Sequence, residues 1–318
     1  MTDRPSVAII IPTFNAESFV SRAIGSALSQ TLPAAEIIVV DDCSTDGTRA
    51  VVEQVARTEP RLRLLTMPRN GGPSAARNTA IAAASSEWVA VLDADDAFEP
   101  GRLEALIPFA VRTGADLVAD DIAYYDAAAE RVTGAGLGDS HILDRPVSLR
   151  DYFAHNPADG KGFDWGLLKP IFRRDMLGAH GVCYDPAIRH GEDFRLVVDL
   201  LLAGARFRLL PLPLYLYTQR QGAISRRASG LSRTNVAYNA LRDAALALSR
   251  DERIAGDPEL VRLLRARAQG LGKLDDAAFF SSAVRDRAVM PLVRRSLHDP
   301  GFMALVLRQT VRALRRRL

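Results

Sequence analysis

Cysteine is nearly absent from this chain of 318 residues, because Cys43 and Cys183 are the only two. Two cysteines support neither a disulfide framework nor a cysteine metal site, so a reducing, cytoplasmic compartment is expected. No apolar run is long enough to cross a bilayer, and the first residues do not have the pattern of a signal peptide. The formal net charge of +3 is too small to indicate a nucleic-acid partner.

What the chain does contain is an ordinary globular composition, 48% hydrophobic and 25% charged, with enough length for one or two domains. In its first hundred residues, short β-branched runs alternate with segments of helical spacing. The strands are expected at 6–11, 36–40, 62–67 and 87–92, and the helices at 18–30, 48–56 and 74–84. This alternation predicts an α/β fold with a mostly parallel sheet and right-handed crossovers.

The rest of the chain is less regular and ends in helical patterns. Strands are expected at 116–125 and 206–217, helices at 175–178 and 192–203, and a loop at 134–144. Further helices are expected at 235–248, 259–271, 275–284 and 302–318. A boundary near 222–230 separates the α/β body from this C-terminal helical region.

The fourth expected strand ends in three carboxylates, Asp93, Asp95 and Asp96. Ligands of open α/β sheets bind beyond the carboxyl ends of the strands. An Asp-x-Asp pair there can hold a hard divalent cation, which can bridge to a phosphate-rich ligand. Acid clusters after strands also serve as helix caps and turn residues, and the spacing alone supports both interpretations equally.

The loops after the other three strands are expected at the same edge. In the first, Phe14 can stack on a planar base, and Asn15 offers hydrogen bonds; a simple Asn turn is the alternative. In the second, Asp42 ends a strand where a carboxylate can accept from a ring N–H or a ribose hydroxyl. In the third, a glycine pair permits close backbone approach, and Arg77 follows in the helix, where it can meet an anion or pair with an acid.

Four ordered motifs, IIPTFN, VVDDCSTDGT, RNGGPSAARN and LDADD, resemble the family 2 glycosyltransferases of the GT-A fold. The resemblance extends from Val7 to about Ser225 and includes an acidic motif at 190–193 (HGED). It implies a GT-A domain at 1–225, with a nucleotide-sugar-binding half at 1–115 and an acceptor half at 116–225. The helical region is then 226–318.

The same resemblance implies roles for individual residues. The nucleotide base would contact Pro12, Phe14 and Asp42, with Asn15 beside them. Asp93 would lie near the ribose and metal, Asp95 would ligate Mn²⁺ or Mg²⁺, and Arg77 would lie near the sugar diphosphate. Asp193 would be the catalytic base, removing the proton of the acceptor hydroxyl. Asp96 is expected to keep a capping role.

Some of these residues have simpler explanations that the sequence leaves open. Glu192 and Asp193 open an expected helix, where acids interact favourably with the positive end of the dipole. His190 can touch the diphosphate or be an ordinary polar loop residue. Trp165 can be a platform for a sugar or a core residue.

The C-terminal segment 302–318 combines apolar and basic residues. Met303, Leu307, Val311, Leu314 and Leu318 fall at helical spacing, and arginines occupy much of the remaining surface. Such a helix can lie on anionic lipid, although a helix docked on the body has the same pattern. Because similar enzymes extend lipid-linked glycans, peripheral association with the inner face of the cytoplasmic membrane is expected.

Together these features predict an inverting, metal-dependent glycosyltransferase. Its expected donor is a nucleotide sugar, with a UDP-sugar as the favoured one, and its expected acceptor is a glycan or lipid-linked glycan. The alternatives are a non-catalytic sugar-nucleotide-binding protein and a sugar nucleotidyltransferase. The second would need a glycine-rich, basic loop after the first strand, and Pro12–Asn15 is not one. A dinucleotide-dependent oxidoreductase is disfavoured because its glycine fingerprint is missing there.

Overall fold

The computed structural model describes residues 5–137, 145–160, 162–188, 190–219 and 237–315. The chain divides into two compact units. The first comprises residues 1–155 and 163–219, and the second comprises 156–162 and 220–318. The boundary expected at 222–230 lies outside the described residues.

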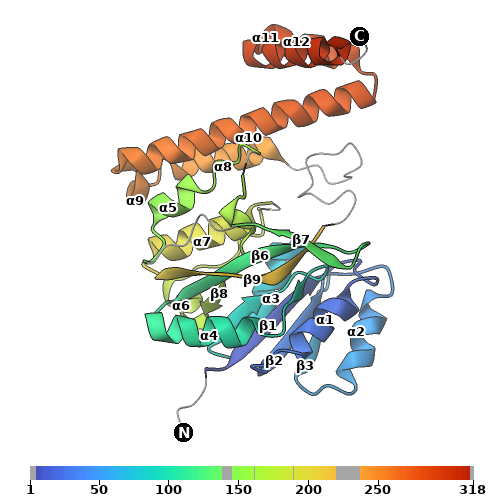
Figure 1. Cartoon of the computed structure of the whole chain (residues 1–318), viewed down its shortest axis with the longest axis vertical. Coiled ribbons are helices and arrows are strands. Elements are labelled where there is room, and N and C mark those ends of the chain that lie inside the picture. Colours follow the sequence, from blue (N-terminus) through green and yellow to red (C-terminus); the bar gives the residue numbers. More distant parts are fainter. Residues whose placement is uncertain (1–4, 138–144, 161, 189, 220–236, 316–318) are drawn as a thin grey trace. The chain divides into compact units, whose positions relative to one another are not determined.

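The sheet of the first unit is built outward from its most apolar strands. β1 (Val7–Thr13) lies between β2 (Glu36–Asp41) and β4 (Trp88–Val91), and β3 (Leu62–Thr66) lies beyond β2. All three pairings are parallel, as the alternation of strands and helices predicted. The apolar residues of β1 and β2 are almost completely buried, because helices pack against the sheet (Figure 1).

Beyond β4 the sheet becomes mixed, so the expected mostly parallel sheet is correct only for its first half. β8 (Ile171–Arg173) pairs antiparallel with β4 and with β6 (Leu117–Asp126), and β9 (Phe207–Gln219) runs parallel to β6. β9 also pairs antiparallel with the short β5 (Ala97–Phe98), and β7 (Arg131–Ala135) pairs antiparallel with β6. β7 overlaps the start of the expected loop 134–144; residues 138–144 lie outside the described residues.

The helices of this unit confirm the strongly periodic segments and add two that were not expected. They are α1 (Val20–Leu28), α2 (Thr48–Ala56), α3 (Gly72–Ala83), α4 (Arg102–Thr113), α5 (Leu149–Ala154), a short 3₁₀ turn η2 (Trp165–Leu167), α6 (Arg174–His180) and α7 (Glu192–Leu202). Of these, α4 and α5 were missed. Pro108 lies inside α4 and removes one helical N–H donor, which weakens the local pattern.

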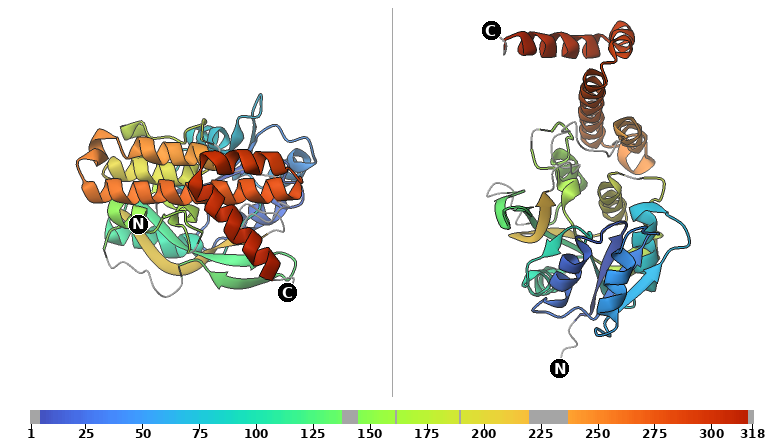
Figure 2. Two further views of the ribbon diagram at one scale, coloured as in Figure 1. Left: turned by 90° about the horizontal axis from the view of Figure 1, so that it is seen from above. Right: turned by 90° about the vertical axis from the view of Figure 1, so that its right-hand side faces the viewer.

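The second unit is helical in its described part. It contains α8 (Tyr238–Leu248), α9 (Glu252–Ala255), α10 (Pro258–Arg285), α11 (Val289–His298) and α12 (Pro300–Arg315). α8 lies alongside α10 (Figure 2), and Ala245, Ala268 and Leu271 form a small apolar core between them. The two helices expected at 259–271 and 275–284 are one continuous helix, because α10 continues through Gly272.

Candidate active site

Hydrogen bonds tie the loops at the carboxyl ends of β1 and β2 together. Asn15, in the left-handed region with φ of 49°, accepts at Oδ1 from the amide of Thr45 at 2.8 Å. Its own amide donates to Oγ of Ser44 at 3.0 Å. The side chain of Asn15 therefore holds the second loop in place. Phe14 beside it is 51% exposed, which leaves its ring available for stacking.

Asp42 ties the second loop to the third. Its two carboxylate oxygens accept from the amides of Gly71 and Gly72, each at 2.7 Å, and the side chain is buried. Gly72 has a φ of 82°, a conformation that favours glycine, and it begins α3. The expected contact of Asp42 with a base stays a prediction, and the structure gives this carboxylate a definite second role in fixing the start of α3.

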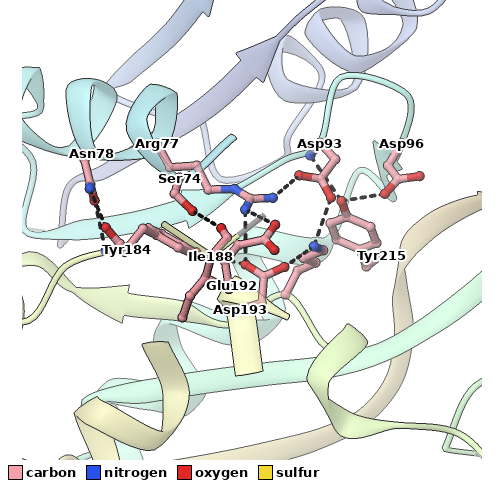
Figure 3. Close-up of polar contacts among 11 residues, drawn as sticks. Ser74, Arg77, Asn78, Asp93, Asp96, Tyr184, Ile188, Glu192, Asp193 and Tyr215 are labelled. Carbon is pink, nitrogen blue, oxygen red and sulfur yellow. Dashed lines mark hydrogen bonds and ion pairs between the residues drawn. The ribbon is translucent and has the colours of Figure 1, made fainter. Parts of the chain in front are cut away.

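Arg77 from α3 joins the fourth loop to α7 (Figure 3). Its guanidinium donates to Asp93 at 2.7 Å and to Glu192 at 2.8 Å, and it lies 3.6 Å from Asp193. The side chain is only 3% exposed. The sequence left open whether Arg77 meets an anionic ligand or pairs with acids, and in the structure it pairs with acids.

Lys169, just before β8, is the second cation of this cluster. Its Nζ lies 2.9 Å from Asp93 and also forms an ion pair with Asp193. Tyr184 donates its hydroxyl to the other oxygen of Asp193 at 3.2 Å. Three carboxylates thus surround two buried cations, which leaves one net negative charge. Burial would lower the pKa of Lys169, but Asp193 and Asp93 outweigh it and raise the pKa well above its ordinary value.

Sequence reasoning missed Lys169 and Tyr184 because neither belongs to the motifs. The one available signal was a lysine set among apolar residues in the segment LLKPIF, where a charged side chain has to find a buried partner. Lys169 and Tyr184 both act on Asp193, so they belong to its immediate surroundings.

The carboxylates of Glu192 and Asp193 do not cap α7. Gly191 is the N-cap residue, and no side chain caps it. The two acids instead point to Arg77, Lys169 and Tyr184. The helix dipole still favours negative charge in this first turn, but capping does not account for the arrangement.

Asp96 does not have the capping role expected of it. It is buried, and it accepts from the hydroxyl of Tyr215 at 2.8 Å and from the amide of Thr218 at 2.8 Å, both on β9. The hydroxyl of Tyr215 in turn accepts from the amide of Asp93 at 3.2 Å. Burial, together with the charges of Asp95 and Asp93, raises the pKa of Asp96 well above its ordinary value. Asp96 therefore anchors the loop that follows β4 to β9, and Figure 3 shows its bond to Tyr215.

The remaining acids differ in their availability to a metal ion. Burial would raise the pKa of Asp93, but Lys169 and Arg77 outweigh it and lower the pKa, so Asp93 is ionised and already paired. Asp95 is half-buried. In the described part of the chain, no group of three His, Cys, Asp or Glu residues could hold a metal ion. One carboxylate is nevertheless sufficient where substrate phosphates complete the coordination of Mg²⁺, so Asp95 fits such an ion.

The other expected site residues lie as follows. Trp165 is 1% exposed and stacks on His155 at a centroid distance of 4.0 Å, so the core interpretation is correct and its faces are not open to a sugar. His190 is half-buried and precedes Gly191, the N-cap residue of α7, and Pro12 lies half-buried near the end of β1.

The fold and the site define the GT-A class, in which loops at the carboxyl edge of a Rossmann-like half-sheet lie opposite an acid-bearing helix. Comparison with known proteins agrees. The profile of glycosyl transferase family 2 matches residues 8–156. Two succinoglycan biosynthesis proteins of Rhizobium meliloti are similar: ExoO is 36% identical over 70% of this chain, and ExoU is 35% identical over 80%. The chain belongs to glycosyl transferase family 2.

The alignments cover part of each relative. The chain spans 63% of the length of ExoO and 72% of the length of ExoU. Among solved structures, S. aureus TarS 1–349 in complex with UDP-GlcNAc is similar in fold, with a TM-score of 0.63 and 24% sequence identity. That likeness covers 83% of this chain and 73% of the TarS chain. At this identity it supports the GT-A fold alone.

Proposed function

We propose that this protein is an inverting glycosyltransferase that moves a sugar from a nucleotide sugar, most simply a UDP-sugar, to a glycan or lipid-linked glycan. The main observation behind this proposal is the arrangement of two acids, Asp93 and Asp193. They come from opposite sides of the site, and both form an ion pair with the ammonium group of Lys169. Two further facts support the proposal. ExoO and ExoU are named for succinoglycan biosynthesis, and TarS was solved with UDP-GlcNAc.

On the donor side, the nucleotide would lie over the joined loops. The exposed ring of Phe14 can stack on the base, while Pro12 and Asn15 shape the floor beside it. Asp93, held in place by Arg77, would lie near the ribose. Because both oxygens of Asp42 already accept backbone amides, a base N–H would use a remaining lone pair.

The leaving diphosphate gains negative charge as the glycosidic bond breaks. A Mn²⁺ or Mg²⁺ ion held by Asp95 would neutralise that charge when bound. On the protein side, Arg77 is aligned by its two carboxylate partners, so its orientation is fixed before the donor arrives.

On the acceptor side, Asp193 would take the proton of the attacking hydroxyl. Its carboxylate is oriented by Lys169 and Tyr184, and it lies at the rim of the cluster with 11% of the side chain exposed. Attack from this side in a single displacement inverts the anomeric centre and needs no covalent intermediate. Glu192 would assist indirectly by holding Arg77.

Features of the second unit favour peripheral association of the protein with an anionic membrane. None of the helices in the described residues is both long and apolar enough to span a bilayer. Exposed apolar residues instead line α11 and α12: Val289, Met290, Val293, Leu297, Met303, Leu307 and Val311. Leu314 and Leu318, also expected on this face, are not among the described side chains. A bilayer surface at the inner face of the cytoplasmic membrane fits this apolar stripe and its arginines.

The first experiment is turnover with UDP-, GDP- and dTDP-sugars, with Mn²⁺, Mg²⁺ or chelator, and a lipid-linked glycan extract as acceptor. We expect acceptor-dependent release of nucleoside diphosphate from at least one donor, which is lost with chelator. Asp193→Asn should lower kcat by about 10²–10⁴-fold and spare donor binding, because only proton removal is impaired. Asp95→Ala should weaken donor binding in the presence of metal ion.

The outcomes separate the rival functions. A sugar-nucleotide-binding protein would bind a donor without releasing diphosphate under any condition. A nucleotidyltransferase would release or consume pyrophosphate instead. Full transfer by Asp193→Asn would show that another residue is the base. The anomeric configuration of the product shows whether the reaction inverts or retains the configuration of the donor.

A further inference from the structure

Lys169 is unusual in this chain because lysine is rare in it. Of 41 basic residues, only Lys161, Lys169 and Lys273 are lysines. The other cations described at buried positions, Arg77, Arg102 and Arg267, are arginines. A guanidinium is a broad planar fork, whereas an ammonium is a compact point charge with three donors. At position 169 the chain therefore has a compact point charge where its other described buried cations are planar forks.

This point charge lies between two acids of the site. Asp93 ends β4 in the donor half, and Asp193 lies in the first turn of α7. Nζ of Lys169 forms an ion pair with Oδ2 of each. Arg77 pairs with the other oxygen of Asp93, and Tyr184 bonds the other oxygen of Asp193. Tyr184 thus bonds Asp193 alone, whereas Lys169 bonds both acids, and Arg77 bonds Asp93 and lies 3.6 Å from Asp193.

Lys169 is also held firmly from its backbone. Its carbonyl accepts from Nη2 of Arg102 at 2.6 Å. Arg102 is completely buried and paired with Asp120, which is completely buried as well. Pro170 and β8 follow directly, and β8 is paired on both sides. A side chain mounted on so rigid a segment can fix the positions of the groups that it binds.

We propose that Lys169 is a positioning residue, whose ammonium holds the donor-side Asp93 and the proton acceptor Asp193 in one fixed arrangement. This inference rests on the proposed glycosyl transfer and deepens it. Without the ammonium, Arg77 remains bonded to Asp93 but lies 3.6 Å from Asp193, so Asp193 loses its closest cation and turns away from the acceptor hydroxyl. Misplacement of a reacting group by about 1 Å can cost about 100-fold in rate.

The kinetic test uses two substitutions that separate charge from packing. Lys169→Met keeps the length and apolar stem but removes the charge, whereas Lys169→Arg keeps the charge but is broader. If the charge positions Asp193, kcat follows the order wild type, Lys169→Arg, Lys169→Met, with about a 100-fold loss for Lys169→Met. The donor KM changes by less than about threefold. Lys273→Met, at an exposed position of α10, is the matched control and retains wild-type kcat.

Several results would overturn the proposal. If Lys169 served only packing, Lys169→Met would keep its kcat and Lys169→Arg would be the damaged variant. If Lys169 served only donor binding, KM would rise while kcat stayed constant. Far-UV circular dichroism establishes whether each variant is folded.

A spectroscopic test does not depend on turnover or on the folding of the Lys169 variants. In full-length protein labelled with ¹⁵N-lysine, the three ammonium groups give three resonances at most. We expect the one assigned to Lys169 to exchange its protons more slowly than that of exposed Lys273, because it is buried and bonded. Asp93→Asn and Asp193→Asn should each shift it.

Failure of the Lys169 bridge and failure of the proposed function give different results. Rapid exchange of Lys169, or a resonance that is unchanged by Asp193→Asn, would refute the bridge even in an active enzyme. A bridge seen by NMR in a protein that transfers no sugar from any donor would refute the proposed function instead.

Discussion

At the scale of single residues, side chains of this site do two tasks at once. Arg77 pairs with Asp93 and Glu192 and so joins α3, the loop that follows β4, and α7. Asp42 closes the start of α3 while lying where a base is expected. Such residues are costly to replace, because one substitution leaves several buried partners without their bonds.

The prediction at this scale concerns Arg77. Replacing it by Met leaves Glu192 without its buried cation and Asp93 with Lys169 alone, and breaking a buried ion pair costs about 3–5 kcal/mol. Arg77→Met should therefore lower the free energy of unfolding of the first unit by about this amount. Urea unfolding followed by tryptophan fluorescence measures it, because both tryptophans, Trp88 and Trp165, lie in that unit.

The control for this prediction is Arg49→Met. Arg49 pairs with Glu53 on the surface of α2 and is 58% exposed, so water replaces the lost contact. We expect no measurable change in its urea midpoint. If the two variants lost the same unfolding free energy, the carboxylates around position 77 would be accommodated without Arg77.

The site residues that could be predicted from the sequence are those in ordered motifs. Asp93, Arg77 and Asp193 were all singled out from motifs, and the structure brings them into one cluster, while the roles expected of them stay predictions. The contacts of Lys169 and Tyr184 with Asp193 could not be predicted, since both residues reach Asp193 from segments whose position depends on the mixed half of the sheet. Asp96 was misjudged because its partners on β9 lie more than a hundred residues away.

At the scale of elements, long periodic segments were predictable and irregular ones were not. α2 agrees with its expected range of 48–56 because its apolar spacing is regular. β8 is three residues long, too short to carry an alternation, and it is defined only by its pairing with β4 and β6. In β9, the register against β6 shifts opposite Pro211–Pro213, where proline cannot donate to the ladder.

The prediction at this scale concerns two glycines of α10. A Cβ at Gly270 would meet carbonyl oxygens of the segment 156–162, at 2.7 Å from that of Ala158 and closer still to that of Pro157. These are backbone atoms and cannot turn aside. Gly270→Ala should therefore destabilise the second unit by about 1–3 kcal/mol, as overpacking does.

The matched control is Gly272→Ala, two residues further on. Its Cβ would meet only Cδ of Arg242, at an ordinary 3.9 Å. Alanine is the better helix former, so this change should stabilise α10 by up to about 1 kcal/mol. Thermal unfolding followed by far-UV circular dichroism measures both, and a loss at Gly270→Ala no greater than at Gly272→Ala would mean that the close approach of segment 156–162 is not maintained.

At the scale of the whole molecule, the chain carries two units of different character. The first holds every described residue of the candidate site and a sheet whose strands β1, β2 and β4 are almost completely buried. The second is helical, and several of its apolar side chains are exposed, with Leu297 at 78% and Met290 at 74%. Exposed apolar residues that share one helix face indicate a surface that is covered in use.

The sequence indicated the α12 part of this surface but not the α11 part, since α11 was not expected as a helix. The structure also alters how membrane binding is best tested. Phe302 of α12 is completely buried and packs edge-on against Phe279 of α10, and Arg295 stacks on both rings. Deleting the residues after Pro300 would strip this contact and disturb α10 as well, so substitutions on the exposed face are the sharper probe.

We therefore predict the behaviour of Met290→Ser/Leu297→Ser on vesicles. The wild-type protein should float with vesicles rich in phosphatidylglycerol and not with phosphatidylcholine alone, and binding should weaken as salt is raised, because arginines contribute through screened charge. The double variant should bind less at every salt concentration, since each serine removes apolar area that would insert into the headgroup region.

The control is Thr79→Ser/Ser85→Ala, in the first unit, which should bind as the wild type does. Equal flotation of wild type and Met290→Ser/Leu297→Ser would exclude this face as the membrane surface, and a change in sedimentation without lipid would assign it to contact between copies of the chain.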